Sequence, residues 1–378
     1  MFGPTRKIIG VIGLGIIGRA VSANLRQKGF QVFVWNRTPR PVPNFVGSPA
    51  ELAELCDFLQ IFVSDDEALR ETVERLSEKL GSRHIVIAHS TVAPDSMRAA
   101  AKIVERRRAR FVEAPFTGSK IAAEKGELVY YVGGSDAALR DARPVLEASG
   151  KQIIKIGEIG QATAVKIATN MVTAASVQGA AEALALVRAL GLPFDRLVEA
   201  MHGNASYSTT LAMKVPKMIE HNFEPHFSVK HMLKDMKIAN QVGVSHHLDL
   251  GVTAAARDQL LDQMQWGHGD DDYSAVARKY LPDTRSIAQE ETRAAVPDVQ
   301  GESGSVVPAS EPTTSLAGLE EPRPEQENGD SATGDVAVST SPSRELKEKA
   351  QLRRGFLRQL LRRGRQLLKQ PVSVSKEG

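Results

Sequence analysis

The residues best suited to chemistry are a lysine and an asparagine on one predicted helix. Lys166 and Asn170 stand four residues apart in the segment from Gln161 to Leu190, which is rich in alanine and has no proline. That spacing places both side chains on one helix face. A protonated lysine beside a carbonyl would stabilise an alkoxide as hydride arrives and then supply its proton. An isolated pair of this kind is usually just solvated, so its weight depends on where the helix begins.

A glycine-rich turn near the N-terminus predicts a dinucleotide site. A strand-like run, KIIGVIG, leads into a helical pattern through Gly13, Leu14, Gly15, Ile16, Ile17 and Gly18. In this context the first glycine permits a tight turn, the second lets a pyrophosphate approach the backbone, and the third lets helix and strand pack closely. The helix N-terminus then offers free N–H groups to the phosphates. The alternative is an ordinary strand-to-helix turn that binds no nucleotide.

The end of the second predicted strand selects the nucleotide. Enzymes that use NAD usually carry Asp or Glu there to bind the ribose 2′-hydroxyl. This chain has Asn36, Arg37 and Thr38 instead. No carboxylate would repel a 2′-phosphate, and the guanidinium of Arg37 could grip one. The sequence therefore favours NADP(H) over NAD(H), against the alternative that Arg37 is a solvated loop charge.

The elements that must position these residues alternate in type over the first half of the chain. Amphipathic helical patterns lie between most of the nearly continuous apolar runs, which are KIIGVIG, FQVFVW, DFLQIFVS, HIVIAHST, RFVEAP, LVYYVGG and KQIIKIG. Such alternation predicts an α/β fold in which a Rossmann domain with a mainly parallel sheet occupies residues 1–158. No strand pattern follows, so residues 159–289 are predicted to be an all-α domain entered by the long helix. Lys166 therefore lies at the junction of two domains, where ligand clefts tend to form.

The remaining residues differ in composition. Residues 290–343 are rich in Pro, Gly, Ser, Thr and acid, and are predicted to be a disordered linker. Residues 344–370 regain helical periodicity, with leucines on one face and arginines on the rest. This basic amphipathic helix could remain solvated, bind an anionic membrane, or dock to an acidic partner or nucleic acid. We expect no nucleic-acid binding by the catalytic body.

Three further segments carry a family resemblance together with the glycine loop. They are EAPFTGSK from Glu113, GEIGQATAVK ending at Lys166 with Asn170 beyond it, and FSVKHMLKD from Phe227 to Asp235. In this order, over roughly residues 5–285, the chain resembles the β-hydroxyacid dehydrogenase family, which includes 3-hydroxyisobutyrate dehydrogenases. The first and third segments are most similar to the glyoxylate/succinic semialdehyde reductase branch.

The resemblance implies roles for individual residues. It implies that Lys166 is the catalytic lysine, that Asn170 is its partner, and that the enzyme is a homodimer or homotetramer. The substrate would be held by Thr91, Thr117, Gly118, Ser119, Phe227 and Asp235. Besides the glycine loop and residues 36–38, the cofactor would be bound by Val63, Ser64, Thr91 and Lys234. The chain departs from the family pattern with Thr117 in place of Ser, Phe116 in place of a smaller apolar residue, and Ala162 in place of Gly.

The overall composition is that of a globular protein. Hydrophobic residues make up 42% and charged residues 25%, and the net charge of +3 conceals a basic tail. One cysteine, Cys56, leaves no disulfide framework, so we expect a reducing, cytoplasmic location, with the tail as a means of peripheral membrane attachment. Among the histidines, His221, His226 and His231 lack the spacing of common zinc sites. We interpret them as ordinary polar residues and expect no metal.

Two function classes remain after this reading. The first is an NADPH-dependent reductase of a small carboxylate-bearing aldehyde or keto acid, of the glyoxylate or succinic semialdehyde type. The same chemistry in reverse would oxidise a 3-hydroxy acid such as 3-hydroxyisobutyrate. The second class is a non-catalytic dinucleotide-binding scaffold that uses its basic tail for binding. The presence of Lys166 favours the enzyme, and it also disfavours an imine reductase on the same fold.

Overall fold

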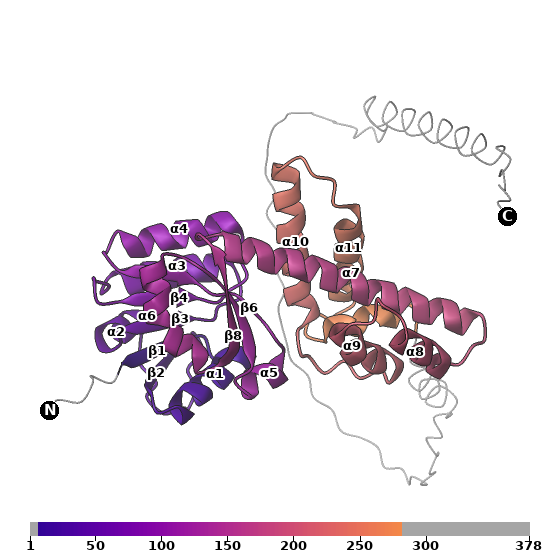
Figure 1. The fold of residues 1–378 in the computed structure, drawn as a ribbon, viewed down its shortest axis with the longest axis horizontal. Coiled ribbons are helices and arrows are strands. Elements are labelled where there is room, and N and C mark those ends of the chain that lie inside the picture. Colours follow the sequence, from indigo (N-terminus) through magenta and orange to yellow (C-terminus); the bar gives the residue numbers. More distant parts are fainter. Residues whose placement is uncertain (1–6, 282–378) are drawn as a thin grey trace, which may run out of the picture. The chain divides into compact units, whose positions relative to one another are not determined.

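The computed structural model describes residues 7–281 and contains one sheet, which lies entirely in the N-terminal part. The strands are β1 (Ile8–Ile12), β2 (Gln31–Trp35), β3 (Phe58–Ile61), β4 (Ile85–Ala88), β5 (Arg110–Glu113), β6 (Phe116–Thr117), β7 (Leu128–Gly133) and β8 (Gly150–Gly157). Their order is β2-β1-β3-β4-β5-β7-β6, with β8 beside β7 (Figure 1). The sheet is parallel from β2 to β5, and β7 is antiparallel to β5 and β6. The predicted fold class, a mainly parallel Rossmann domain followed by helices, is confirmed.

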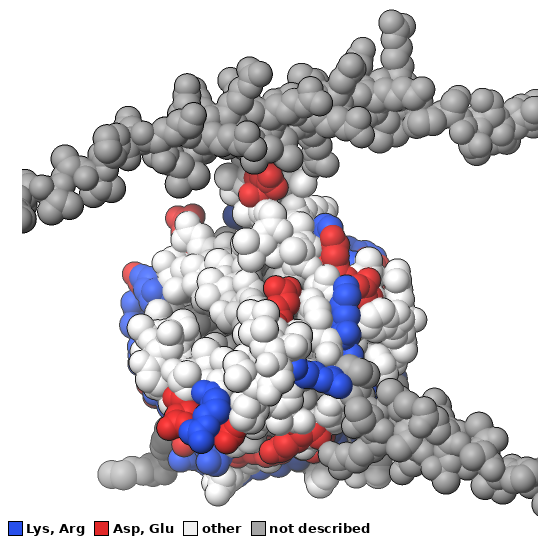
Figure 2. All heavy atoms as spheres, turned by 90° about the vertical axis from the view of Figure 1, so that its right-hand side faces the viewer, with Lys and Arg blue, Asp and Glu red and all other residues white. Residues whose placement is uncertain are grey.

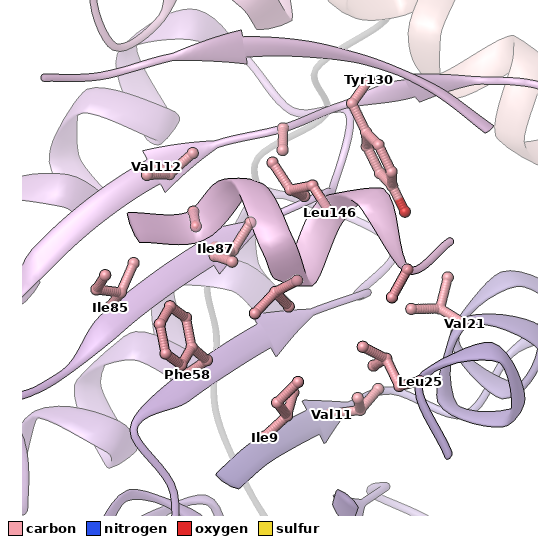
Figure 3. Close-up of a cluster of buried hydrophobic side chains, with 14 of the residues drawn as sticks. Ile9, Val11, Val21, Leu25, Phe58, Ile85, Ile87, Val112, Tyr130 and Leu146 are labelled. Carbon is pink, nitrogen blue, oxygen red and sulfur yellow. The ribbon is translucent and has the colours of Figure 1, made fainter. Parts of the chain in front are cut away.

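The helices of the Rossmann domain cover both faces of this sheet. They are α1 (Ile16–Gln27), α2 (Pro49–Leu55), α3 (Asp66–Ser77), α4 (Pro94–Glu105), α5 (Lys120–Glu124) and α6 (Asp136–Glu147). Alternate strand residues therefore enter two different cores. Figure 3 shows one of them, in which Ile85 and Ile87 of β4 face the same side as Leu146 of α6, while Val86 and Ala88 pack on the opposite side. Each fully buried aliphatic side chain contributes about 1.5–3 kcal/mol, so the strand ends that carry the site are firmly held.

A long helix leads from the sheet into the helical region, which we define as residues 161–281. This helix is α7 (Gln161–Ala189), and it packs against β7, β8 and α4 before reaching the remaining helices. Those are α8 (Phe194–His202), α9 (Thr209–Ile219), α10 (Val229–Ser245), α11 (Gly251–Gln265) and a 3₁₀ helix (Tyr273–Lys279). Small residues such as Ala174 and Ala181 let neighbouring helices approach α7, and both are buried in the shared core. One helix therefore packs on the sheet at one end and organises a second core along its length.

One helix was not expected from the sequence. We did not predict α9, whose interior contains Pro216, a residue that weakens a helical pattern. In the structure this helix begins with Ser208, whose hydroxyl accepts a hydrogen bond from Leu211 N at 3.3 Å. Cys56 is fully buried, as expected of a small core residue.

The far end of α7 presents apolar side chains to solvent. Leu186 is 62% exposed, Leu190 65% and Leu192 53%. Figure 2 views the molecule from this end and shows a face on which uncharged residues predominate. Contiguous apolar exposure is typical of surfaces that contact another chain. If the chain assembles with copies of itself, burial of this face would be favourable.

No helix among residues 7–281 is long and apolar enough to cross a membrane. The predicted linker at 290–343 and the predicted basic helix at 344–370 lie outside the described residues.

Candidate functional site

The glycine loop is shaped by close backbone contacts at its two outer glycines. Gly13 has φ of 93°, and a Cβ there would lie 2.1 Å from the carbonyl oxygen of Phe62. A Cβ on Gly18 would lie 1.9 Å from the carbonyl oxygen of Gly13. No atom lies within 4 Å of a Cβ built on Gly15. The outer glycines are therefore required by packing, whereas the middle one leaves room for a ligand to approach the backbone.

The first turn of α1 fits a pyrophosphate. Its N-cap, Gly15, provides no side-chain hydrogen bond, and the side chain of Ile16 is 40% exposed. Unpaired N–H groups at a helix N-terminus attract phosphate. Leu14 plays a different part, because its side chain is buried and its N–H donates to Asn36 Oδ1 at 2.9 Å. The open space at Gly15 and the uncapped turn together fit the dinucleotide that the sequence predicts.

Asn36 fixes the loop that follows β2. Besides accepting from Leu14 N, its amide donates to Thr38 O at 2.7 Å. The side chain therefore joins the two cofactor loops. Arg37 and Thr38 are exposed at the same edge. The guanidinium of Arg37 is therefore exposed beside the loop that Asn36 fixes.

Charges from three separate elements converge beside this loop. Burial raises the pKa of Asp65, but hydrogen bonds from Ser64 and the N–H of Ala68, together with Lys234 and Arg37, outweigh it and hold that pKa below its ordinary value. Ser64 itself donates to Asp65 Oδ2 at 2.6 Å. The ends of β2 and β3 are thus close enough to α10 to interact electrostatically.

The loops after β3 and β4 are tied together beneath the predicted cofactor. Val63 N donates to Ser90 Oγ at 3.1 Å. Phe62 stacks on His89 with ring centroids 4.2 Å apart. Burial lowers the pKa of His89 to about 3, so this imidazole is neutral. Thr91 follows directly, and its carbonyl oxygen accepts a hydrogen bond from Lys234 of α10. The segment from 62 to 64 and the segment from 89 to 91 therefore form one rigid support.

The predicted carboxylate-binding segment presents unengaged hydroxyl groups. Thr117 ends β6, and Ser119 stands before α5 without capping it. Neither hydroxyl is hydrogen bonded to any residue between 7 and 281. Gly118 between them has φ of 122°, a conformation that glycine adopts without strain. Phe116 points away into the Rossmann core, where its ring lies 6.3 Å from that of Tyr130.

A buried carboxylate fixes the start of α7. Glu113, at the end of β5, is fully buried and accepts hydrogen bonds from Ala162 N at 2.8 Å and Thr163 N at 3.3 Å. Gly160 precedes the helix with φ of 94° and offers no side-chain cap. Burial raises the pKa of Glu113, and the N–H donors oppose that rise. An acidic group at a helix N-terminus is favourable, so Glu113 anchors the turn that comes just before Lys166.

Lys166 begins a chain of hydrogen bonds that links α7 to α10. Its Nζ donates to Asn170 Oδ1 at 2.9 Å, and Asn170 Nδ2 donates to Asp235 Oδ2 at 2.6 Å. The other carboxylate oxygen of Asp235 accepts from Lys234 Nζ at 2.7 Å. Lys234 continues to the carbonyl of Thr91 in the Rossmann domain. Residues predicted from separate motifs are thus brought together in one network.

This environment changes the acidity of Lys166. Burial lowers its pKa to about 8, Asp235 opposes that shift, and Lys234 reinforces it. A lysine of this kind exchanges its proton near neutral pH far more readily than an ordinary one. Asp235 has 1% of its side chain exposed and both oxygens engaged. The contact that we predicted between Asp235 and substrate stays a prediction, and in the structure its oxygens accept from Asn170 and Lys234.

A second buried ion pair holds the loop that carries Phe227. Lys214 Nζ lies 2.7 Å from both carboxylate oxygens of Asp272, and the two side chains are 3% and 0% exposed. Asp272 also accepts from the N–H groups of His226 and Phe227 at 3.0 and 3.3 Å. We did not identify Asp272 from the sequence as a structural residue. Nothing in the sequence indicated this pair, because Lys214 lies 58 residues from Asp272.

Sequence reasoning also missed Ser90 and the capping role of Glu113. The signal for Glu113 was present in the Glu-Ala-Pro segment, since an acid at the end of a buried strand requires a partner. Ser90 gave no signal, because its bond to Val63 depends on the adjacency of β3 and β4.

Known proteins share the two regions of this chain and its fold. Residues 8–157 match the family described as the NAD binding domain of 6-phosphogluconate dehydrogenase. Residues 160–280 match the family described as the NAD-binding domain of NADP-dependent 3-hydroxyisobutyrate dehydrogenase. The fold is similar to that of the Mycobacterium tuberculosis 3-hydroxyisobutyrate dehydrogenase, with a TM-score of 0.66 and 26% identity, covering 73% of this chain and 99% of that one.

Two curated relatives of different kinds are comparably similar. Glyoxylate/succinic semialdehyde reductase 1 of Arabidopsis thaliana is 31% identical over 282 residues, which span 71% of this chain and 96% of that protein. The human cytokine-like nuclear factor N-PAC is 31% identical over 288 residues, which span 74% of this chain but 52% of that protein. The match to the reductase therefore covers nearly the whole relative, and the match to N-PAC about half. With its two matched regions and its near full-length similarity to the reductase, the chain belongs to the β-hydroxyacid dehydrogenase family and is an NAD(P)-dependent hydroxyacid dehydrogenase or reductase.

Proposed function

We propose that this enzyme uses NADPH to reduce a small carboxylate-bearing aldehyde or keto acid to the hydroxy acid, with Lys166 as proton donor. Glyoxylate and succinic semialdehyde are the substrates we favour. The same site would run in reverse on a 3-hydroxy acid such as 3-hydroxyisobutyrate. One observation carries the proposal: the pKa of Lys166 is lowered to about 8 by burial, at the head of a network that reaches α10 and Thr91.

The cofactor half of the proposal rests on the glycine loop and on residues 36–38. The nicotinamide, when bound, supplies hydride to the carbonyl carbon. Gly15 and the first turn of α1 would hold the pyrophosphate, and Arg37 would hold a 2′-phosphate through its planar guanidinium. Asn36 keeps both loops in register through Leu14 and Thr38. Preference for NADP(H) follows from the absence of a carboxylate at the end of β2.

Lys166 would hold the proton that the product needs. In its ammonium form it can donate a hydrogen bond to the substrate oxygen and then release a proton to it as negative charge develops. Asn170 accepts one N–H of the ammonium group and so directs the others. Asp235 stabilises Asn170 and offsets the charge of Lys234, which keeps a second cation close without driving Lys166 fully neutral.

The substrate class follows from groups that complement a carboxylate. The free hydroxyls of Thr117 and Ser119, with the backbone at Gly118, offer hydrogen-bond donors at the entrance of α5. The name of the Arabidopsis relative supports acids of this size. We therefore expect aldehydes without an acid group to be poor substrates. Thr117→Ala should chiefly raise KM, because this contact exists in both the ground state and the transition state.

The alternative is a dinucleotide-binding scaffold, and the similarity to the nuclear factor N-PAC favours considering it. The decisive test is turnover by the purified full chain with glyoxylate, succinic semialdehyde, 3-hydroxyisobutyrate and an uncharged aldehyde, followed by the absorbance of the reduced cofactor. We expect oxidation of NADPH with the first two. Binding of NADPH without turnover of any of these compounds would favour the scaffold.

A further inference from the structure

The serine that precedes α10 does not cap the helix. A serine at this position usually accepts a hydrogen bond from the N–H of the second or third helical residue. Ser228 makes no such bond. Its hydroxyl instead lies 2.6 Å from Nδ1 of His231, the third residue of the helix.

Other groups satisfy the start of α10. Val229 N donates to Asp271 O at 2.8 Å, and Lys230 N donates to Gly269 O at 3.0 Å. The next two N–H groups bond to the carbonyl of Ser228. The helix therefore does not depend on the serine hydroxyl, and within residues 7–281 that hydroxyl serves to hold the imidazole of His231.

His231 lies on the site side of α10. It precedes Lys234 by three residues, so the two side chains share a helix face. Lys234 contacts Thr91 of the Rossmann domain, which marks this face as the one turned toward the cofactor loops. The imidazole also stacks on Phe227, with ring centroids 5.8 Å apart and planes at 28°.

The carboxylate-binding segment lies across from the same loop. Lys120, the residue after Ser119, places its Nζ 3.5 Å from Glu224 Oε1. Glu224 stands three residues before Phe227, in the loop that Asp272 holds through the N–H groups of His226 and Phe227. The hydroxyls of Thr117 and Ser119 and the ring of His231 are therefore carried by two segments that touch.

The ring of His231 is held neutral. Burial lowers its pKa, and Lys234 and Lys230 lower it further against the opposing effect of Asp235 and Asp270. With Nδ1 bound to Ser228, Nε2 has no hydrogen-bond partner among residues 7–281. A neutral imidazole fixed through one nitrogen offers the other as a directional donor or acceptor.

We propose that His231 is a specificity-determining residue whose Nε2 donates a hydrogen bond to the substrate carboxylate, from the side opposite Thr117 and Ser119. Ser228 is then a positioning residue that fixes the ring and its tautomer by donating to Nδ1. This inference rests on the proposed function, since it takes the ligand to be a small carboxylic acid.

The test compares four variants of the full chain. His231→Phe keeps the stacking on Phe227 and removes both nitrogens. His231→Gln can bring an amide N–H near the position of Nε2, whereas His231→Asn reaches only the position of Nδ1. Ser228→Ala releases the ring. The matched control is Ser208→Ala, which removes a hydroxyl that does cap its helix, α9.

A hydrogen bond to a charged group contributes enough that its loss should raise KM for glyoxylate by roughly tenfold or more in His231→Phe. We expect kcat and the Kd for NADPH to change little. His231→Gln should recover part of the loss and His231→Asn should not. Ser228→Ala should raise KM several-fold while lowering Tm less than Ser208→Ala, which should leave KM unchanged.

A second measurement separates this proposal from the proposed function. The Kd of succinate for the protein loaded with NADP⁺, measured by calorimetry, should rise in His231→Phe in the same proportion as KM. Absence of turnover in the unmodified chain would defeat the proposed function, and succinate binding would still decide the role of His231. An unchanged KM and an unchanged Kd in His231→Phe would overturn the inference. So would failure of the unmodified protein to bind succinate, or a change confined to kcat.

Discussion

The glycine loop and the lysine network are built in opposite ways. The loop is made of backbone, and the contacts that demand Gly13 and Gly18 come from the loop itself and from Phe62, which follows β3. The network is made of side chains that come from distant parts of the chain. Its hydrogen bonds join Asn170 to Asp235, which are 65 positions apart, and Lys234 to Thr91, which are 143 positions apart. A site made of backbone can be read from adjacent residues, whereas a network of side chains exists only once the helices have packed.

The two regions also differ in exposure. Gly15 faces open space, while Asp235 has 1% of its side chain exposed. Open backbone suits the reversible binding of a large cofactor. A buried network suits control of a single proton, because charges interact more strongly away from water. We therefore expect variants in the two regions to change different measured quantities.

The largest effect should come from Lys166→Ala. General acid catalysis typically contributes about 10²- to 10⁴-fold, so kcat should fall by that factor while NADPH binding survives in the other region. Stopped-flow turnover and cofactor titration would measure the two separately. Lys237→Ala, at an exposed position on α10, is the control and should leave both unchanged. Near-normal turnover in Lys166→Ala would contradict the expectation that the lysine network controls kcat while the glycine loop controls cofactor binding.

Lys214→Met should have the next largest effect, on stability. Removing one partner of a buried ion pair leaves the other charge uncompensated, which costs about 3–5 kcal/mol in the free energy of unfolding. Denaturant unfolding would measure this loss. Lys230→Met, which breaks an exposed ion pair with Asp270, should cost less than about 1 kcal/mol. Equal losses for the two variants would show that Lys214 does not support the loop of Phe227.

Arg37→Asp tests the cofactor loop, and it should change the preference between NADPH and NADH. A carboxylate at the end of β2 favours the 2′-hydroxyl and repels a 2′-phosphate. The ratio of kcat/KM for NADPH to that for NADH should therefore fall by roughly tenfold or more, the equivalent of one charged hydrogen bond. Arg40→Asp, farther along the loop, should have a smaller effect. An unmodified enzyme that used both cofactors equally would contradict the assigned preference.

The smallest expected effect is on how the rate of reduction depends on pH. Lys166 must be protonated to donate, and its pKa is lowered to about 8. The rate of reduction should therefore be full well below pH 8 and fall as the pH rises through that value, as the ammonium form is lost. Asp235→Asn should move this alkaline limb to lower pH, because Asp235 raises the pKa of Lys166. A limb that stayed fixed in Asp235→Asn would separate Asp235 from the network.

The sequence predicted the helices and strands wherever the pattern of neighbouring residues was enough to identify them. The run from Ile85 to Ala88 is buried on both faces, and such a run reads as a strand of a parallel sheet. The Ala-rich segment of α7 was predicted within one residue of its observed end at Ala189. The antiparallel course of β7 was not predicted, since it depends on the pairing of Gly133 with Glu113 across twenty residues of chain. The proline in α9 concealed that helix.

The sequence predicted which residues belong to the candidate site, but it did not predict the hydrogen bonds that join them. Lys166 and Asn170 share a helix, so their contact followed from spacing. The contact of Asp235 with Asn170 did not, because it requires α7 and α10 to cross at that point. A family resemblance assigns a role to a residue but does not say which neighbours that residue contacts. Asp235 illustrates this, because its two oxygens accept from Asn170 and Lys234.

The anchoring of α7 has a mechanical consequence. The helix has 29 residues, a length of about 43 Å, and it is clamped at its first turn by Glu113. Three residues separate it from β8, and Gly160 among them sits against the guanidinium of Arg98. The clamp and the packing of this end of α7 on β7, β8 and α4 hold the start of the helix against the sheet. A rotation of about 10° there would swing the far end of the rod by roughly 7 Å while moving Lys166 very little. Lys166 stands five residues after the start of the helix, so a bend of the helical region would displace it far less than the exposed leucines at the other end.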